Sequence, residues 1–263
     1  MSRGNEAKTL FMRGEYESAF KLFSELAADG DAVSAFNVGY CCLHGYGVEK
    51  DPVMAKSYFT YAVNIVPEAA YNLAIMHLHG IGVKRNYKKS FSYMQDSASL
   101  GCVEAQLYLG IAHTLGSMFE PDVVEISLIP YHTPIYRDDS YLLMGQIDDF
   151  EEDEESRMSA VRCDPVTAFE WFREASRQDA TYTAELSLKG KYLYARCYLD
   201  GVGVDFNRDK ANELMVLAAS EGSQEALVYL NTDAPYMLPK LEDKQYIAGI
   251  ARLEGRRVEL DTM

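Results

Sequence analysis

Apolar and small residues recur three and four positions apart along several stretches of this chain. In "DPVTAFEWFREAS", which starts at Asp164, they are Ala168, Trp171, Phe172 and Ala175. This spacing places them on one face of an α-helix, because the side chains of a half-buried strand would alternate every second residue. Similar stretches start at Asn207, at Asn86, at Asp51 and, in incomplete form, at Gly14. The pattern therefore predicts a series of amphipathic helices.

A second pattern precedes most of these helices. "AFNVGYCCLHGYGVEKD" aligns with "AYNLAIMHLHGIGVKRN", and the core motif "LHGYGV" at 43–48 returns as "LHGIGV" at 78–83 and "LDGVGV" at 199–204. Gly45 and Gly80 are 35 residues apart, a period typical of helical repeat proteins. We therefore expect a repeated unit made of helix A, a glycine turn and helix B.

The paired glycines raise the question of whether the motif binds a ligand. A phosphate-binding glycine loop follows a strand and opens a helix, whereas this motif follows a helix and lacks a lysine–serine pair. We therefore interpret Gly45 and Gly47 as turn residues that adopt positive φ, and Val48 as a residue that fills the joint.

Helix B has a clear start signal in two copies, Asp51-Pro52 and Asp164-Pro165. The carboxylate can accept hydrogen bonds from free N–H groups, and proline at the first helical position loses no internal hydrogen bond. Small residues in helix A would let paired helices approach closely; they are Gly39, Ala74, Gly110 and Ala195. Because one pair cannot bury its apolar face alone, neighbouring pairs must stack, and the sequence predicts an all-α solenoid.

These motifs together resemble the Sel-1-like repeat family, a branch of the tetratricopeptide-like helical solenoids. The shared pattern is A-x-Y/F-N-L/V-G/A, then L-x-G-x-G-V, then a capped helix with A-x-x-W/Y-F/M-x-x-A, over 31–101 and 164–222 and partially over 5–30 and 102–117. The resemblance implies a right-handed solenoid of stacked antiparallel helix pairs that binds proteins or peptides without chemistry of its own. Some secreted relatives carry a disulfide in each repeat, but this chain lacks the paired cysteines.

We expect a single solenoid over residues 1–263. Its approximate units are a partial repeat at 1–30, repeats at 31–66 and 67–101, an interrupted repeat at 102–180, a repeat at 181–222 and a C-terminal cap at 223–263. The segment "LEDKQYIAGIARLEGRR" is predicted to be a capping helix, because a terminal repeat needs a polar outer face.

One repeat lacks its turn. "EAQLYLGIAHTLGSMFEPD" begins as a helix A, but its Gly116 is not followed by a second glycine and valine. The next helix-B cap, Asp164, lies 48 residues after Gly116, whereas Asp51 lies 6 residues after Gly45. About 42 residues, roughly 118–159, are therefore an insert in this repeat.

The insert has an apolar, aromatic part and an acidic part. "VVEISLIPYHTPIYR" contains two prolines that oppose a continuous helix, and "DDFEEDEE" at Asp148–Glu155 has seven acids in eight residues. A long loop inside a compact repeat is usually functional or disordered. Its tyrosines would suit either partner recognition or anchoring of the loop on the solenoid; they are Tyr131, Tyr136 and Tyr141.

Charge and hydropathy narrow the possible partners. The net charge of −15 disfavours non-specific binding to nucleic acid or to an anionic membrane. A local basic patch has its best candidates in Lys84, Arg85, Lys88 and Lys89, which would otherwise be the solvated start of a helix. No stretch has the apolar length of a signal peptide or a membrane span, so we expect a cytoplasmic protein that binds neither nucleic acid nor membrane.

The cysteines are five, an odd number, and none forms a C-x-x-C pair. We therefore expect neither a disulfide framework nor a structural zinc site, and interpret most of them as buried apolar residues. They are Cys41, Cys42, Cys102, Cys163 and Cys197.

Candidate partner-binding residues follow from the repeat register and the resemblance. His44 and His79 occupy equivalent positions at the end of helix A, which faces the concave groove in tetratricopeptide-like geometry. The same carry-over places further groove residues at Tyr40, Ile75, Ile111, Arg196 and Asp200. Such stacked positions would bind an extended peptide, or they are ordinary exposed residues. His77 and His79 point roughly 200° apart on a helix, so we expect no metal site there.

No catalytic motif supports an enzyme. The chain has no G-x-S-x-G, H-E-x-x-H or G-K-[ST] pattern, and Cys41 beside Cys42 has no evident low-pKa setting. We predict a non-catalytic adaptor without cofactor that binds a protein or peptide partner on its concave face, aided by the insert. Two alternatives stay open: a hydrolase or redox enzyme that uses groove histidines and cysteines, and a structural subunit of a larger assembly.

Overall fold

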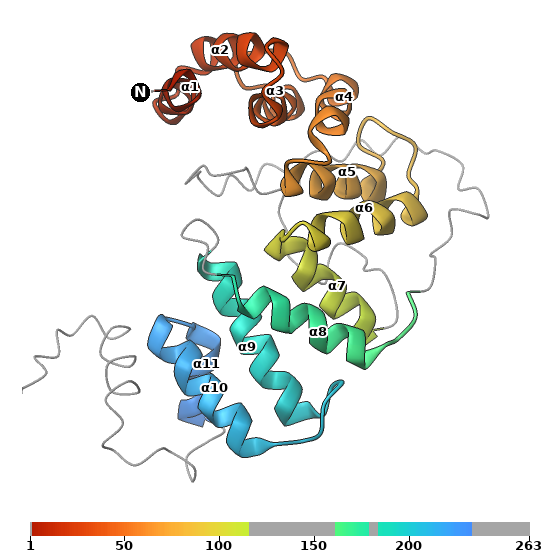
Figure 1. Ribbon diagram of the computed structural model, residues 1–263, viewed down its shortest axis with the longest axis vertical. Helices are drawn as coiled ribbons and strands as arrows, with labels where there is room; N and C mark the ends of the chain where they lie inside the picture. The colour runs from red at the N-terminus through yellow and green to blue at the C-terminus, as the bar shows by residue number, and fades with distance from the viewer. Residues whose placement is uncertain (1, 116–160, 179–183, 233–263) are drawn as a thin grey trace, which may run out of the picture. The chain divides into compact units, whose positions relative to one another are not determined.

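A computed structural model describes residues 2–115, 161–178 and 184–232, and every regular element in these ranges is an α-helix (Figure 1). The predicted all-α fold class is confirmed. The insert, with its three tyrosines, and the predicted capping helix lie outside the described residues. The helices are α1 (Arg3–Met12), α2 (Tyr16–Ala28), α3 (Ala32–His44), α4 (Pro52–Ala62), α5 (Pro67–His79), α6 (Tyr87–Ser99), α7 (Val103–Leu115), α8 (Pro165–Ser176), α9 (Ala184–Asp200), α10 (Arg208–Glu221) and α11 (Gln224–Thr232).

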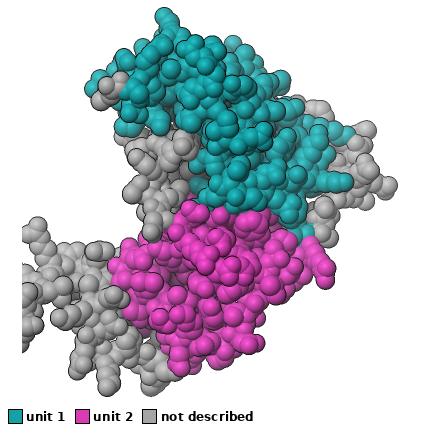
Figure 2. Space-filling view, in the orientation of Figure 1, with its two compact units in different colours: residues 1–105, 117–161 teal, residues 106–116, 162–263 magenta. Residues whose placement is uncertain are grey.

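The chain divides into two compact units (Figure 2). Unit 1 comprises residues 1–105 and 117–161, and unit 2 comprises residues 106–116 and 162–263, so the division falls inside α7. In unit 1 each helix from α1 to α6 packs on the next one in the chain, and in unit 2 the same holds from α8 to α11. Each unit is thus a row of consecutive helices. A single continuous solenoid stays a prediction.

The expected helix starts are present. Asp51 accepts a hydrogen bond from the Met54 N–H at 2.8 Å, and Pro52 follows it in the first turn, a cap that stabilises α4 by about 1 kcal/mol. The side chains of Asn86, Asp164 and Asn207 cap α6, α8 and α10 in the same way. Helix B therefore begins at the same residue of each repeat.

The glycine turns adopt the backbone conformation that the sequence predicts. Gly45 has φ 81° and Gly47 has φ 69°, both in the left-handed region, and the corresponding glycines of the other two turns match them. The N–H of Gly45 donates to the carbonyl of Cys41, which ends α3. A residue with a Cβ would be strained at either position.

The second glycine of each turn has an additional packing role. A Cβ on Gly47 would overlap the backbone of Tyr16, the first residue of α2. A Cβ on Gly82 would lie 2.6 Å from Pro52 Cβ at the start of α4, and a Cβ on Gly203 would overlap the carbonyl of Pro165 at the start of α8. Each turn therefore packs directly on the first residue of the preceding helix B. The motif joins successive repeats.

The interrupted repeat closes despite its insert. The N–H of Asp164 donates to the carbonyl of His113 at 3.0 Å, the same bond that joins Asp51 to Cys42 at 2.8 Å in a regular repeat. Phe172 of α8 also packs against Gly110 of α7, as Phe59 of α4 packs against Gly39 of α3; a Cβ on Gly110 would lie 2.5 Å from the Phe172 ring. These contacts make α7 and α8 one helix pair. Among the described helices, none is long and apolar enough to cross a membrane.

Candidate functional site

The groove candidates occupy two positions of the repeat, and their burial differs. The first position lies one residue before the first turn glycine and holds His44, His79 and Asp200. The second position lies five residues before that glycine and holds Tyr40, Ile75, Ile111 and Arg196. Tyr40 and Ile75 are 3% and 4% exposed, so they offer almost no surface to a partner. The two histidines and Ile111 are half-buried. The side chains of Arg196 and Asp200 on α9 are 40% and 45% exposed, so both can reach a partner.

In unit 1, Tyr40 and His44 belong to an aromatic cluster that joins the first partial repeat to the glycine turn. Their ring centroids lie 4.3 Å apart, and Tyr46 of the turn stacks on Tyr40 at 6.0 Å. Phe11 of α1 contacts the Tyr46 ring at 5.4 Å, and Tyr16 of α2 contacts it at 4.8 Å. The two candidates thus take part in packing between α1, α2 and α3, which accounts for the burial of Tyr40.

The two turn histidines are neutral near pH 7. Burial, assisted by the charge of Lys50, lowers the pKa of His44 to about 4. Burial and the charge of Arg85 lower the pKa of His79 in the same way. Lys50 and Arg85 occupy equivalent positions of successive repeats. Near the glycine turns of unit 1, the positive charge therefore comes from Lys50 and Arg85 and not from the two histidines.

In unit 2, α9 brings two of the predicted residues into direct contact. Arg196 Nε and Nη2 both donate to Asp200 Oδ2, at 3.0 and 2.9 Å, and Arg196 Nη1 donates to Tyr192 Oη at 3.2 Å. Each of the three residues is four positions from the next, so all three share one side of the helix. We term Tyr192, Arg196 and Asp200 the α9 stripe. Its contacts orient the guanidinium from both sides while much of the side chain remains exposed.

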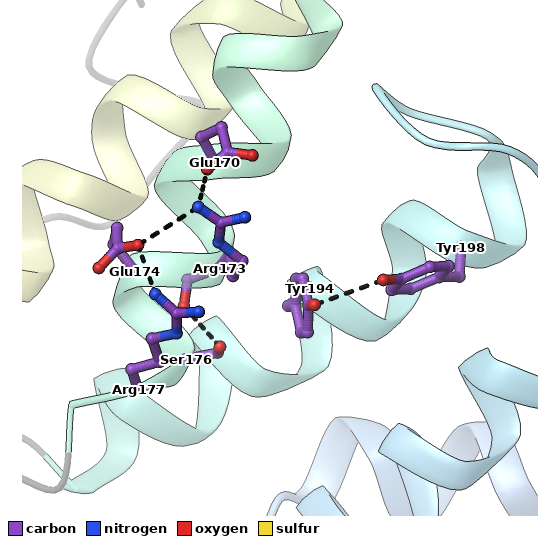
Figure 3. Close-up of polar contacts among 7 residues, drawn as sticks. All are labelled: Glu170, Arg173, Glu174, Ser176, Arg177, Tyr194 and Tyr198. Atoms are coloured by element: carbon purple, nitrogen blue, oxygen red, sulfur yellow. Dashed lines mark hydrogen bonds and ion pairs between the residues drawn. The ribbon is translucent and has the colours of Figure 1, made fainter.

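Two further tyrosines of α9 lie against α8. The hydroxyl oxygens of Tyr194 and Tyr198 are 3.4 Å apart (Figure 3), and Phe169 of α8 packs on the two rings at centroid distances of 5.3 and 5.7 Å. Burial, followed by the contact with Tyr198, raises the pKa of Tyr194 to about 12. These residues were not among the predicted site residues. Their four-residue spacing in "YARCY" is the signal that would have paired them.

The neighbouring surface of α8 carries a row of alternating charges (Figure 3). Arg173 pairs with Glu170 and lies 3.7 Å from Glu174, and Arg177 pairs with Glu174 at 2.8 Å. Glu170–Arg173 and Glu174–Arg177 are each three residues apart, and such pairs stabilise an exposed helix by about 0.2–0.5 kcal/mol each. Because both arginines have carboxylate partners, this row stabilises α8 and does not form an anion site.

A model of the Sel1 repeat matches the chain four times, at residues 32–64, 67–102, 159–179 and 189–223. This chain is a Sel1 repeat protein. The third match starts near the end of the insert and covers α8, the helix B of the interrupted repeat. Sel1 repeat solenoids are typically protein-interaction scaffolds and are generally non-catalytic.

Two solved structures resemble this Sel1 repeat protein. The crystal structure of a Sel1 repeat protein from Oxalobacter formigenes matches with a TM-score of 0.61 and 17% identity, covering 86% of this chain and 74% of that one. The structure of c5321, a protective antigen present in uropathogenic Escherichia coli strains and displaying an SLR fold, matches with a TM-score of 0.43 and 18% identity, covering 91% and 49%. No curated protein matches the sequence. The first likeness shows the fold that the two chains share.

The buried thiols of the Sel1 repeat protein are not activated. Burial raises the pKa of Cys41 and Cys197 to about 12 and that of Cys42 to about 11. Cys102 is also buried, its pKa is raised, and its thiol donates to Glu104 at 3.1 Å. Because a nucleophilic cysteine must be a thiolate, these four disfavour the hydrolase or redox alternative. Within the described ranges, no three His, Cys, Asp or Glu residues are placed to hold a metal ion.

Proposed function

We propose that this Sel1 repeat protein is a non-catalytic adaptor that binds a protein or peptide segment on its helix-A surface, with the α9 stripe as the main contact. The observation that carries the proposal is the departure of Arg196 from the repeat. The equivalent positions in unit 1 hold the buried residues Tyr40 and Ile75, whereas α9 exposes an oriented arginine. Packing of the helix pair does not require a charged group at this position.

The chemistry of the α9 stripe suits protein recognition. Arginine and tyrosine are enriched among the residues that contribute most to interfaces. Arg196 is already held by Tyr192 and Asp200, so it loses less conformational freedom when a partner binds. Its remaining N–H groups can donate to peptide carbonyls or carboxylates, and the free carboxylate oxygen of Asp200 can accept a peptide N–H.

We also propose that the protein is cytoplasmic and that the insert takes part in partner binding. The five cysteines are free thiols in the structure, which is compatible with a reducing cytoplasm, where such thiols persist. The aromatic part of the insert, with Tyr131, Tyr136 and Tyr141, would add contacts to the same partner.

Quantitative affinity capture from the native cells tests the proposal. The Arg196→Ala/Tyr192→Ala variant should recover the specific partner at least about tenfold less well than the unaltered chain, because it removes both donors of the α9 stripe. The matched control is Lys210→Ala/Glu213→Ala, which removes an exposed ion pair on α10 in the same unit. If Arg196→Ala/Tyr192→Ala recovers as much partner as Lys210→Ala/Glu213→Ala does, the partner binds to another surface.

A further inference from the structure

Basic residues are concentrated in one segment of unit 1. Between residues 49 and 89 the chain has six lysines and arginines, namely Lys50, Lys56, Lys84, Arg85, Lys88 and Lys89, but only three acids, Glu49, Asp51 and Glu68. Asp51 caps α4, and burial raises the pKa of Glu68 to about 7, so much of its negative charge is suppressed at neutral pH. This segment is therefore positive in a chain whose net charge is −15.

Four of these charges lie on elements that meet at α5, because α5 packs on both α4 and α6. Lys56 lies on α4, Lys84 in the turn after α5, and Lys88 and Lys89 on α6, and all four are exposed. Besides burial, the charges of Lys89 and Lys56 lower the pKa of His77 on α5, so lysines from α4 and α6 both lie within electrostatic reach of one ring. In the part of the chain that the structure describes, Lys56, Lys88 and Lys89 make no ion pair.

The fold does not explain these charges. Lys88 and Lys89 occupy the first turn of α6, where the helix dipole is already positive and basic side chains are unfavourable. The Asn86 side chain caps this helix by accepting from the backbone N–H of Lys89, a bond that needs neither lysine side chain. The equivalent residues of α4, Val53 and Met54, show that the repeat forms without a charge at these positions.

We propose that Lys56, Lys84, Lys88 and Lys89 form a basic surface that binds a short acidic segment of a partner protein. Charge complementarity gives the class of partner. Salt screens charges beyond about 8 Å under physiological conditions, so a short segment responds to the local positive potential. A nucleic acid duplex or a membrane extends further and also meets the acidic remainder of the chain. The basic surface lies in unit 1, whereas the α9 stripe belongs to unit 2.

Fluorescence anisotropy with a labelled octapeptide that contains seven glutamates tests this surface, with the glutamine version of the peptide as the uncharged control. The unaltered chain should bind only the acidic peptide, and more weakly as salt is added. Lys88→Glu/Lys89→Glu should weaken binding at least about tenfold. The matched variant Arg13→Glu/Lys21→Glu changes the net charge equally at two exposed positions, the residue after α1 and a residue of α2, and it should bind almost as tightly as the unaltered chain.

Three outcomes would overturn the proposal. Equal loss in both charge-reversal variants would mean that only the total charge matters. Binding that appears only after Asp148–Glu155 is changed to Asn and Gln would mean that the acidic stretch of the chain itself occupies the surface. Duplex DNA or phosphatidylserine vesicles that bind as tightly as the peptide, with the same loss in Lys88→Glu/Lys89→Glu, would show a different class of partner.

Discussion

Gly47 combines two requirements in one residue. Its φ of 69° favours glycine, and its α-carbon faces the backbone of Tyr16 so closely that a Cβ would overlap it. The first requirement follows from the turn motif in the sequence. The second requirement arises only when the turn packs on the preceding helix B. It therefore cannot be predicted from the sequence of a single repeat.

Replacing Gly47 with alanine should therefore cost more than replacing an ordinary turn glycine. We expect Gly47→Ala to lower the free energy of unfolding by about 2–4 kcal/mol, from backbone strain plus overlap. Gly14→Ala is the control, because Gly14 has φ 79° but no described atom within 4 Å of an added Cβ, and should cost about 1 kcal/mol. Urea unfolding of both variants measures the difference. Equal losses would contradict the packing role of the turn.

Glu68 is a second residue whose behaviour depends on its surroundings. Its Oε2 is buried and has no hydrogen-bond partner among the described residues. Burial, with a smaller contribution from the charge of Glu104, raises its pKa from 4.5 to about 7. The folded state therefore keeps a proton that the unfolded state releases between about pH 4.5 and pH 7. Its contribution to stability is present at low pH and is lost as the pH rises through 7.

Glu68→Gln should remove this pH dependence. Relative to the unaltered chain, the variant should gain about 2.5 kcal/mol of unfolding free energy between pH 5 and pH 8, because a shift of one pKa unit corresponds to about 1.4 kcal/mol. Glu17→Gln, at an exposed glutamate of α2, should follow the unaltered chain at both values. Chemical denaturation at the two pH values measures the change. A constant difference between Glu68→Gln and the unaltered chain would show that Glu68 is ionised in the fold.

At the scale of the elements, the sequence correctly predicted the features that depend on residues close together in the chain. Helix caps such as Asp51 and turn glycines such as Gly45 depend on neighbours within a few residues, and both are present as expected. Burial depends instead on what covers a helix, which the repeat register does not specify. For this reason Tyr40 and Ile75 were expected on an accessible face but are 3% and 4% exposed.

The contacts that the sequence analysis missed cross from one helix to another. Tyr194 and Tyr198 are joined through Phe169 of α8, which only the helix pairing brings to them. The pair of Arg196 and Asp200 was predicted as two separate groove residues, and their four-residue spacing accounts for the ion pair. Whether these residues bind a partner stays a proposal.

The pairing of α7 with α8 predicts that the insert is dispensable for folding. The hydrogen bond from Asp164 to His113 and the packing of Phe172 on Gly110 should persist when residues 117–160 are replaced by a turn of regular length. Shortening the loop from about 48 to about 6 residues should stabilise the chain by roughly 2 kcal/mol, since each halving saves about 0.6 kcal/mol. Circular dichroism and thermal unfolding measure both effects. Loss of helicity from the described repeats would contradict this interpretation, and unchanged partner binding would exclude a role for the insert.

At the scale of the whole molecule, burial of the thiols distinguishes a scaffold from a cysteine-dependent enzyme. Cys163 is exposed, whereas the other four cysteines are buried. We expect one of the five thiols of the native chain to react rapidly with Ellman's reagent, and Cys163→Ser to abolish that phase. Unfolding in denaturant, with all thiols accessible, provides the control. A rapid phase that persists in Cys163→Ser would identify an activated buried thiol and support the enzyme alternative.

The central claim is that the helix-A surface binds a protein through the α9 stripe. Site-specific photo-cross-linking in the native cells tests it most directly, with a photoreactive amino acid at Tyr192 and, as control, at the exposed Glu213 of α10. We predict one dominant cross-linked partner from position 192 and none from position 213, with the product lost on Arg196→Ala. No cross-link at 192, or the same products from both positions, would contradict the claim.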